Sequence, residues 1–371
     1  MKILDRYVLK SFVFNYVLSL ITLISLYVVL DLFVNFDEFT EGQRPVVSIV
    51  RSIADYYFYN LPLYFHQLSG VISAFAACAT LARLHRLNEV TSILASGTSM
   101  YRLSAPIILA GMATNALVIL DQEIVLPSVA AKLARNRDDV EGARAYGIWC
   151  VRDGANRLLS ARQFSPKQGR IRGLIVMELA AEPGFEGRMG DVILADKAEW
   201  TRREGRQGWR LERGIRISVR DAWVGGLQRD NVLDRTPIDF YEAELPPEEL
   251  MFRQTAQWIR FLSLRQLQDL QRRQDVDTVQ VAQIKHGRLT LPINNMIMLL
   301  MGLVFFMHRL PGAVLTQGAK ALGMCAASFL VVFIGQQVVG AATPQLVGLP
   351  AWLPIFLFGP VVAVLLSGVR T

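Results

Sequence analysis

Residues 11–33 read SFVFNYVLSLITLISLYVVLDLF, a run in which Asp31 is the only charged side chain. A helix needs roughly 20 consecutive apolar residues to cross the hydrocarbon layer of a bilayer. The whole chain of 371 residues is 52% hydrophobic and 19% charged, with a mean hydropathy of +0.31. That balance is too apolar for a soluble protein of this length, so the run predicts the first helix of a membrane protein.

Five further apolar stretches of similar length follow, and they predict a membrane α-helical fold with six transmembrane helices. The predicted spans are 11–33, 57–81, 103–124, 289–307, 321–342 and 349–369. The first run is longer than the apolar core of a secretory signal and lacks a clear small-residue cleavage site. We therefore expect it to remain in the protein as a span.

Basic residues in the short connecting segments predict the orientation, because Lys and Arg are enriched on the cytoplasmic side. If both termini are cytoplasmic, one side of the membrane receives Lys2, Arg6, Lys10, Arg83, Arg86, Arg102, Arg309, Lys320 and Arg370. The opposite segments, 35–55 and 343–348, hold only Arg44 and Arg51 as bases. We therefore expect a multi-pass protein with both termini in the cytoplasm.

Most charged residues lie between the third and fourth spans, where we expect a water-soluble domain outside the cytoplasm. Residues 126–262 contain short runs rich in β-branched and aromatic residues, separated by Asp-Gly, Gly-Arg and Gly-Gly turn signals. Their spacing predicts a β-jelly-roll or sandwich. The tryptophans are expected in its core, with a carbohydrate platform as the less favoured alternative: Trp149, Trp200, Trp209, Trp223 and Trp258.

The chain thus divides into three regions. Residues 1–125 carry the first three spans, 126–262 the β domain, and 263–371 a connecting helix and the last three spans. The connecting helix is predicted to begin at Ser263, a suitable N-cap. Its basic residues are expected to face water or lipid headgroups, and a specific site for an anionic substrate is the alternative. The net charge of +7 gives no reason to expect a nucleic-acid partner.

Residues 88–97, NEVTSILASG, predict a short amphipathic helix within about 83–97, between the second and third spans. At 100° per residue, one face gathers Leu84, Leu87, Val90 and Leu94, and the other gathers Asn88, Glu89, Ser92 and Ser96. Gly97 is placed to end the helix as a left-handed cap. Spacing alone favours neither a helix lying in the headgroup layer nor a coupling helix that inserts into a groove of a cytoplasmic partner.

Several other classes of site are not expected. The three cysteines offer no disulfide framework, and the four histidines have no partner at ligand spacing, so no metal site is predicted. The phosphate-binding pattern G-x-x-x-x-G-K-[ST] is absent, so any use of ATP would need another chain. No acidic residue follows Asp277, which disfavours a proton- or sodium-coupled carrier. We assign no catalytic residue and do not expect an enzyme.

Six segments together resemble a known family. They are KILDRY (2–7), NEVTSILASGTS (88–99), EIVLP (123–127), WCVRDG (149–154), LSLRQL (262–267) and KHGRLTLPINNMIMLLMGLVFF (285–306). In order and spacing these segments resemble the permeases of lipopolysaccharide export (LptF/LptG, also called YjgP/YjgQ), across essentially the whole chain. KILDRY favours the LptG type. The resemblance implies a protein of the bacterial inner membrane with its β domain in the periplasm.

The resemblance further implies half of a transporter. In that family two permeases, one LptF-like and one LptG-like, bind a dimeric cytoplasmic ATPase (LptB-like) and a single-span LptC-like protein, and pass lipopolysaccharide to a periplasmic LptA-like bridge. ATP and Mg²⁺ would be used by the ATPase, and this chain would bind no cofactor. Glu89 would contact the ATPase, flanked by Arg83 and Arg86 and supported by the rest of the segment: Leu87, Val90, Leu94 and Gly97.

The family's lateral gate lies between the first and fifth spans. Here the resemblance points to Tyr27, Asp31 and Phe33 on the first span and to Phe329 and Phe333 on the fifth. LptG-type members can carry a basic residue for lipid phosphates near the outer end of the first span, whereas this chain reads LDLFVNFDEF at 30–39. Since carboxylates repel phosphates, we expect compensation by Arg44, Arg51 or Arg288, or a less phosphorylated lipid.

Two other functions stay open from the residues alone. One is a stand-alone envelope protein whose β domain binds a ligand or partner and whose helices only anchor it. The other, less favoured, is a secondary transporter. Six spans with a capped cytoplasmic helix are more than an anchor requires, so ATP-driven lipid export is the leading prediction.

Overall fold

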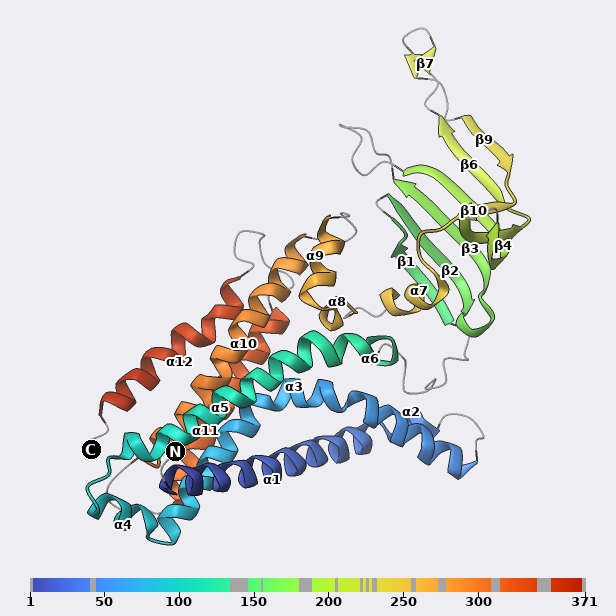
Figure 1. The fold of residues 1–371 in the computed structure, drawn as a ribbon. Helices are drawn as coiled ribbons and strands as arrows, with labels where there is room; N and C mark the ends of the chain where they lie inside the picture. Colours follow the sequence, from blue (N-terminus) through green and yellow to red (C-terminus); the bar gives the residue numbers. More distant parts are fainter. Residues whose placement is uncertain are drawn as a thin grey trace. The chain divides into compact units, whose positions relative to one another are not determined.

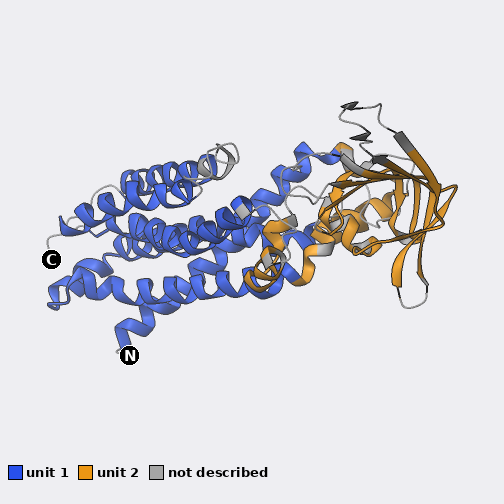
Figure 2. Ribbon diagram, turned by 90° about the horizontal axis from the view of Figure 1, so that it is seen from above, with its two compact units in different colours: residues 1–36, 57–127, 278–371 blue, residues 37–56, 128–277 orange. Residues whose placement is uncertain are grey.

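The predicted fold class is confirmed by a computed structural model. Its described residues include six helices long and apolar enough to cross a membrane and, between the third and fourth of them, an antiparallel β-sheet (Figure 1). The chain splits into two compact units, one with residues 1–36, 57–127 and 278–371 and the other with 37–56 and 128–277 (Figure 2). The structure describes residues 3–40, 45–133, 146–154, 156–179, 189–203, 206–220, 223–224, 227–228, 232–254, 258–272, 278–307, 314–338 and 348–368.

The first unit is built from long helices. They are α1 (Ile3–Val34), α3 (Val46–Arg86, whose first residues belong to the second unit), α5 (Met100–Leu120), α10 (Thr278–Val304), α11 (Val314–Val338) and α12 (Leu349–Ser367), with the short α4 (Glu89–Ala95) between α3 and α5. A π-helical turn, Asp121–Val125, and α6 (Leu126–Leu133) continue α5. α10 begins at Thr278, before the predicted start of the fourth span at 289. The prediction started too late because the first turns of this helix are polar and do not belong to the apolar run.

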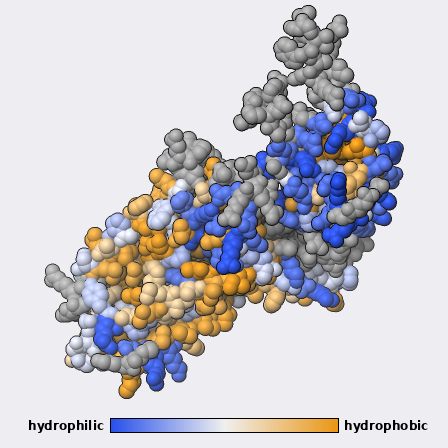
Figure 3. All heavy atoms as spheres, turned by 45° about the horizontal axis from the view of Figure 1, so that its top comes forward, coloured by the Kyte–Doolittle hydropathy of each residue, from blue (hydrophilic) through white to orange (hydrophobic). Residues whose placement is uncertain are grey.

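Burial separates central from peripheral helices. In the most apolar stretch of each, 61% of residues are buried for α10 and 56% for α3, against 6% for α1 and 17% for both α11 and α12. The buried residues of α1, α3, α5 and α10 meet in one apolar cluster that includes Phe12, Leu81, Ile107 and Leu299. The large hydrophobic surface on the helical unit, visible in Figure 3, is what a bilayer would cover.

Polar side chains also join the central helices. Asn295 on α10 donates hydrogen bonds to Ser69 Oγ on α3 (2.9 Å) and to Asn115 Oδ1 on α5 (3.0 Å). Close packing accompanies these bonds, because a Cβ added at Gly70 would lie only 2.6 Å from Asn295 Oδ1. Small residues and interhelical amide bonds are how helices associate within a membrane, so this junction fixes how α3, α5 and α10 fit together.

The second unit contains an eight-stranded antiparallel sheet. Its strands are β1 (Tyr146–Arg152), β2 (Arg157–Ser165), β3 (Arg170–Leu179), β4 (Met189–Arg203), β5 (Arg206–Glu212), β6 (Ile215–Arg220), β9 (Val232–Pro237) and β10 (Phe240–Glu242). The order is β1-β2-β3-β4-β5-β10, and β6 pairs with both β4 and β9. β4 is long enough to pair with β6 through residues 192–194 and with β5 through 197–203. A separate ribbon joins β7 (Trp223–Val224) to β8 (Leu227–Gln228).

The tryptophans of this unit are only partly as predicted. Trp209 is fully buried, and Trp200 packs edge-on against it with ring centroids 5.1 Å apart. Trp149, however, is 74% exposed. The reason is a bulge in β1, where Cys150 has φ 50° and the pairing shifts between Ile148 and Val151, so that two consecutive side chains point outward. The side chains of Trp223 and Trp258 lie outside the described residues.

Short helices lead from the sheet back to the membrane. They are α7 (Pro247–Gln254), α8 (Trp258–Phe261) and α9 (Leu264–Arg272). All but the first residue of α2 (Phe36–Thr40) also belongs to this unit. Ser263 caps α9 as predicted: its Oγ accepts from the Gln266 N–H (3.3 Å), and Gln266 Oε1 accepts from the Ser263 N–H (2.8 Å). This reciprocal pair is a capping box, and it explains why the helix begins where it does.

Candidate functional site

The segment predicted as one helix over about 83–97 is divided in two. α3 ends at Arg86, the chain turns at Leu87 and Asn88, and α4 begins at Glu89. Asn88 has φ 56°, a left-handed conformation that interrupts the helical hydrogen-bond ladder and shifts the angular positions of the residues after it. The prediction that Leu87 shares one helical face with Val90 and Leu94 is therefore wrong, because Leu87 lies in the turn between the two helices and is 54% exposed.

The short helix α4 is nevertheless amphipathic. Val90 is fully buried, and Ile93 and Leu94 pack on the cluster shared by the spans, whereas Ser92 and Ser96 are exposed. Gly97 ends the helix with φ 81°, and its N–H donates to the Leu94 carbonyl at 2.9 Å, which is the left-handed glycine cap that its position predicts. The helix is thus fixed on one side by burial and open on the other.

Glu89 occupies the first turn of α4 and has a partner on α1. The Tyr7 hydroxyl lies 3.0 Å from Glu89 Oε1 and 2.9 Å from Oε2, so it donates to the carboxylate. A second contact, Arg102 Nη2 to Asp5 Oδ1 at 3.5 Å, joins the start of α5 to the same turns of α1. Sequence reasoning selected Glu89 but missed Tyr7, since nothing local connects residues 82 positions apart.

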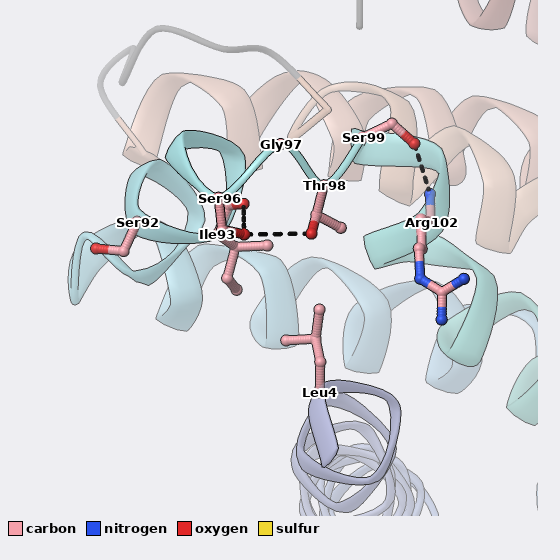
Figure 4. Close-up of a pocket in the computed structure, with 8 residues that line it drawn as sticks. All are labelled: Leu4, Ser92, Ile93, Ser96, Gly97, Thr98, Ser99 and Arg102. Carbon is pink, nitrogen blue, oxygen red and sulfur yellow. Dashed lines mark hydrogen bonds between the residues drawn. The ribbon is translucent and has the colours of Figure 1, made fainter. Parts of the chain in front are cut away.

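A pocket of about 720 Å³ opens beside these contacts. It is lined by Leu4, Ser92, Ile93, Ser96, Gly97, Thr98, Ser99 and Arg102. Figure 4 shows the hydroxyls of α4 and of the connecting turn on one wall, with Leu4 from α1 opposite. Ser99 caps α5 by accepting from the Arg102 N–H at 3.3 Å. The result is a hydroxyl-rich hollow with one cationic side chain at its edge.

The remaining residues predicted beside Glu89 lie at the end of α3. Arg83 and Arg86 are both exposed. Together with Leu87 and α4 they form a surface that we call the α4 surface, defined by residues 83, 86, 87, 89, 92 and 96. It carries one carboxylate and two guanidinium groups, so it can form ion pairs with a partner of either charge.

The candidate gate residues on α1 are held to α3 in part. Tyr27 contacts Tyr64 with ring centroids 4.6 Å apart. Asp31 accepts a hydrogen bond from the Tyr57 hydroxyl (2.9 Å) and another from the Asn35 side chain (3.1 Å). Asp31 is therefore engaged within the helical unit as a tie between α1 and α3. Phe33 differs from both, with 87% of its surface exposed.

The two gate candidates on α11 also differ from each other. Phe329 is half-buried and packs on a cluster built from α3, α10, α11 and α12 that contains Met301 and Phe358. Phe333 is 50% exposed. Of the five gate candidates, Phe33 and Phe333 thus offer the most apolar surface to a lipid or to a second subunit.

The three arginines predicted to meet lipid phosphate lie in different environments. Arg288 on α10 is buried, and its Nη1 lies 3.0 Å from Glu123 Oε1, so it already has a carboxylate partner. Glu123 belongs to the π-helical turn after α5, a feature often found at functional sites. Arg51 is exposed near the start of α3. Arg44 lies outside the described residues.

The WCVRDG segment has a structural explanation. Asp153 is fully buried, and its carboxylate accepts from the Tyr241 hydroxyl (2.6 Å) and from the backbone N–H groups of Glu244 and Leu245 (both 2.9 Å). Burial, and then the Asp153 carboxylate, raise the pKa of Tyr241. This buried carboxylate ties the end of β1 to the residues after β10, so the hydrogen bonds of Asp153 serve the structure of the domain. Within the described ranges, no group of three or more His, Cys, Asp or Glu side chains could hold a metal.

These features define a class: a multi-pass membrane protein with a large β domain inserted between its third and fourth spans and a short amphipathic helix between the second and third. The family follows from comparison. Residues 6–367 match the model of the lipopolysaccharide export system permease LptF/LptG, so the chain belongs to that family of inner-membrane permeases. A comparison with curated proteins gives no match. The match covers both types and does not separate LptG from LptF.

Proposed function

We propose that this chain is the membrane-spanning subunit of an ATP-driven lipopolysaccharide exporter and that the α4 surface docks on the cytoplasmic ATPase. The observation that carries the proposal is the construction of α4. Val90 anchors it in the helical core, Glu89 is half-buried beside Tyr7, and Ser92 and Ser96 are exposed. A helix that only rested on lipid would present apolar side chains to the bilayer. The apolar side chains of α4 instead pack against the helical core of the same protein.

The orientation belongs to the proposal. Both termini and α4 are cytoplasmic, and the β domain is periplasmic. Figure 1 supports the grouping, since the N-terminus and α4 lie at the same end of the helical unit. The bond from the Tyr101 hydroxyl to the Leu366 carbonyl (2.6 Å) adds the end of α12 to that group. The many bases of these segments agree with a cytoplasmic location.

A second permease subunit would complete the channel. α1 and α11 are among the least buried spans and expose large apolar residues, including Phe14 and Leu26 on α1 and Leu330 and Phe333 on α11. The lipid would enter between the first and fifth spans, beside Tyr27, Phe33 and Phe329. The LptF-like or LptG-like neighbour, the LptC-like protein and the LptA-like bridge are partners of this proposal. The chain itself binds no cofactor, and the LptB-like ATPase uses ATP and Mg²⁺.

Lipid phosphates require cationic contacts along this route. Arg51 fits this role because it is exposed, and Arg44 remains a candidate from the sequence. Arg288 is the least accessible of the three, because it is buried and already paired with Glu123. Replacing each arginine with Gln and measuring crosslinking to the lipid tests the set, and unchanged crosslinking in all three variants would reject phosphate compensation.

The proposal is tested by purifying the tagged protein in mild detergent and identifying its partners by mass spectrometry. We expect an ATPase and a second six-span subunit. Glu89→Lys should abolish lipid release while the protein stays folded, because the change reverses the charge offered to the ATPase. Glu212→Lys is the matched control, since Glu212 is an exposed carboxylate paired with Lys197 (3.0 Å) in the β domain. Normal export by Glu89→Lys would reject docking through Glu89. A helix that only lies on the lipid surface should accept lysine at this position.

A further inference from the structure

We propose that Tyr7 is a positioning residue that orients Glu89 and connects α4 directly to α1, so that movement of α4 is transmitted to the first span. The inference rests on the proposed function, because it concerns how ATPase docking is transmitted. It adds Tyr7 to the proposed docking through Glu89, and it names the contact by which α4 acts on α1.

The first contact between α1 and α4 is made by the hydroxyl group of Tyr7. Tyr7 lies in the second turn of α1 and reaches both Glu89 oxygens at 2.9–3.0 Å. The half of α1 that carries Tyr7 is anchored, because Val8 and Phe12 are fully buried in the cluster that also contains Val90. In the most apolar stretch of the helix, by contrast, only 6% of residues are buried. A displacement of the anchored end can therefore change the direction of the more exposed part of α1.

The chemistry of the pair leaves Glu89 available to a partner. Tyrosine donates one neutral O–H, so the carboxylate keeps its full charge, and a carboxylate has about four acceptor positions. Tyr7 is 42% exposed and Glu89 is half-buried. A basic side chain of the ATPase can therefore join the carboxylate while Tyr7 holds its orientation. A lysine or arginine at position 7 would instead compete for the same charge.

Two further contacts reinforce the connection. Asp5 lies 3.5 Å from Arg102 at the start of α5, and Leu4 faces Ile93 across the pocket (Figure 4). Leu4 also packs on the apolar cluster that contains Val90. The first turns of α1 thus touch both ends of the segment between the second and third spans. When α4 tilts, these contacts move α1, which is a proposed gate helix.

The test replaces Tyr7 with Phe in the complete complex, reconstituted in proteoliposomes. Three quantities are measured: ATPase recovered with the permease, ATP hydrolysed, and lipopolysaccharide released per ATP. The loss of one hydrogen bond should lower lipid release per ATP roughly threefold to tenfold, while ATPase recovery stays at the wild-type level. A merely structural role would instead lower the amount of assembled complex.

Tyr101→Phe is the matched control. Tyr101 is 44% exposed and also loses one hydroxyl bond at the same end of the unit, to a backbone carbonyl and not to Glu89. It should leave release per ATP within twofold of wild type. An equal loss in both variants would overturn the inference, as would wild-type coupling in Tyr7→Phe.

A double-mutant cycle shows whether Tyr7 acts through Glu89. In a Glu89→Ala background, Tyr7→Phe should change coupling by less than about twofold, because the acceptor that Tyr7 orients is already gone. Independent, multiplying losses would contradict a shared path. If the wild-type chain recovers no ATPase, the proposed function fails and this inference fails with it. If wild type exports and only the Tyr7 effect is absent, the inference alone fails.

Discussion

Replacing Asp153 with Ala should destabilise the β domain more than any exposed carboxylate change. Asp153 is fully buried, and three donors converge on it: one hydroxyl and two backbone N–H groups. Alanine offers none of them an acceptor. Each of the three donors then loses the carboxylate acceptor that satisfies it inside the domain.

The size of the effect follows from those donors. A buried donor left without a partner costs about 1–3 kcal/mol, and costs at neighbouring sites are not fully additive. We expect a loss of about 3–6 kcal/mol in the free energy of unfolding. Since domains are typically stable by only 5–15 kcal/mol, the variant should unfold at a clearly lower urea concentration. Asp153→Asn keeps the acceptor for both backbone groups and should lose less.

The measurement is a urea titration of the full-length protein in detergent, followed by tryptophan fluorescence. Five of the six tryptophans lie between Trp149 and Trp258, so the signal reports mainly on the β domain. Asp196→Ala is the control, because Asp196 is exposed and its ion pair with Arg213 (2.9 Å) should contribute less than about 1 kcal/mol. A loss below 1 kcal/mol for Asp153→Ala would refute the reasoning.

Three further predictions follow from other contacts. Glu123→Leu should lower the free energy of unfolding by about 3 kcal/mol or more, because it leaves Arg288 buried without its carboxylate. Adding Arg288→Met should restore most of that loss. Size-exclusion chromatography after heating measures how much of each variant stays folded. The pKa of Tyr241 is raised in the folded protein. The stability that its neutral hydroxyl contributes is therefore complete below pH 10 and declines as the pH rises above that value. Tyr241→Phe should make the free energy of unfolding depend less on pH above 10. Gly97→Ala should cost about 1 kcal/mol from φ 81° alone, since a Cβ there meets nothing within 4 Å, and an unchanged melting temperature would contradict this.

Local patterns were sufficient for the membrane helices and for much of the β domain. The six spans were predictable because a bilayer demands a long apolar run from each helix separately. The capping of α9 by Ser263 and the left-handed cap at Gly97 were predictable for a related reason, since each depends on residues within one turn. Trp149 was not, because a bulge at Cys150 breaks the alternation that places side chains in or out.

The candidate site was only partly accessible in this way. Glu89 was selected from its place in a short amphipathic segment and from resemblance to a family. The grouping of Leu87 with Val90 on one helical face was wrong, because the left-handed Asn88 separates α3 from α4 and changes the angular positions of the residues that follow. The pairing of Glu123 with Arg288 was also absent from the prediction, although Arg288 was a candidate contact for lipid phosphate and Glu123 lies in the EIVLP segment. A charged side chain reveals its type in the sequence but not its partner.

The sequence by itself determined the surroundings of each segment. It indicated the bilayer for six helices, water for the inserted β domain, and the membrane surface for the amphipathic segment 88–97. These follow from the transfer free energies of neighbouring side chains, which act over a few turns. Only the tertiary structure decided which side chains meet: Tyr7 with Glu89, Asp31 with Tyr57, Arg288 with Glu123 and Asn295 with Ser69. Hydrogen bonds and ion pairs act over about 3 Å between groups far apart in the chain, so they depend on how the helices pack.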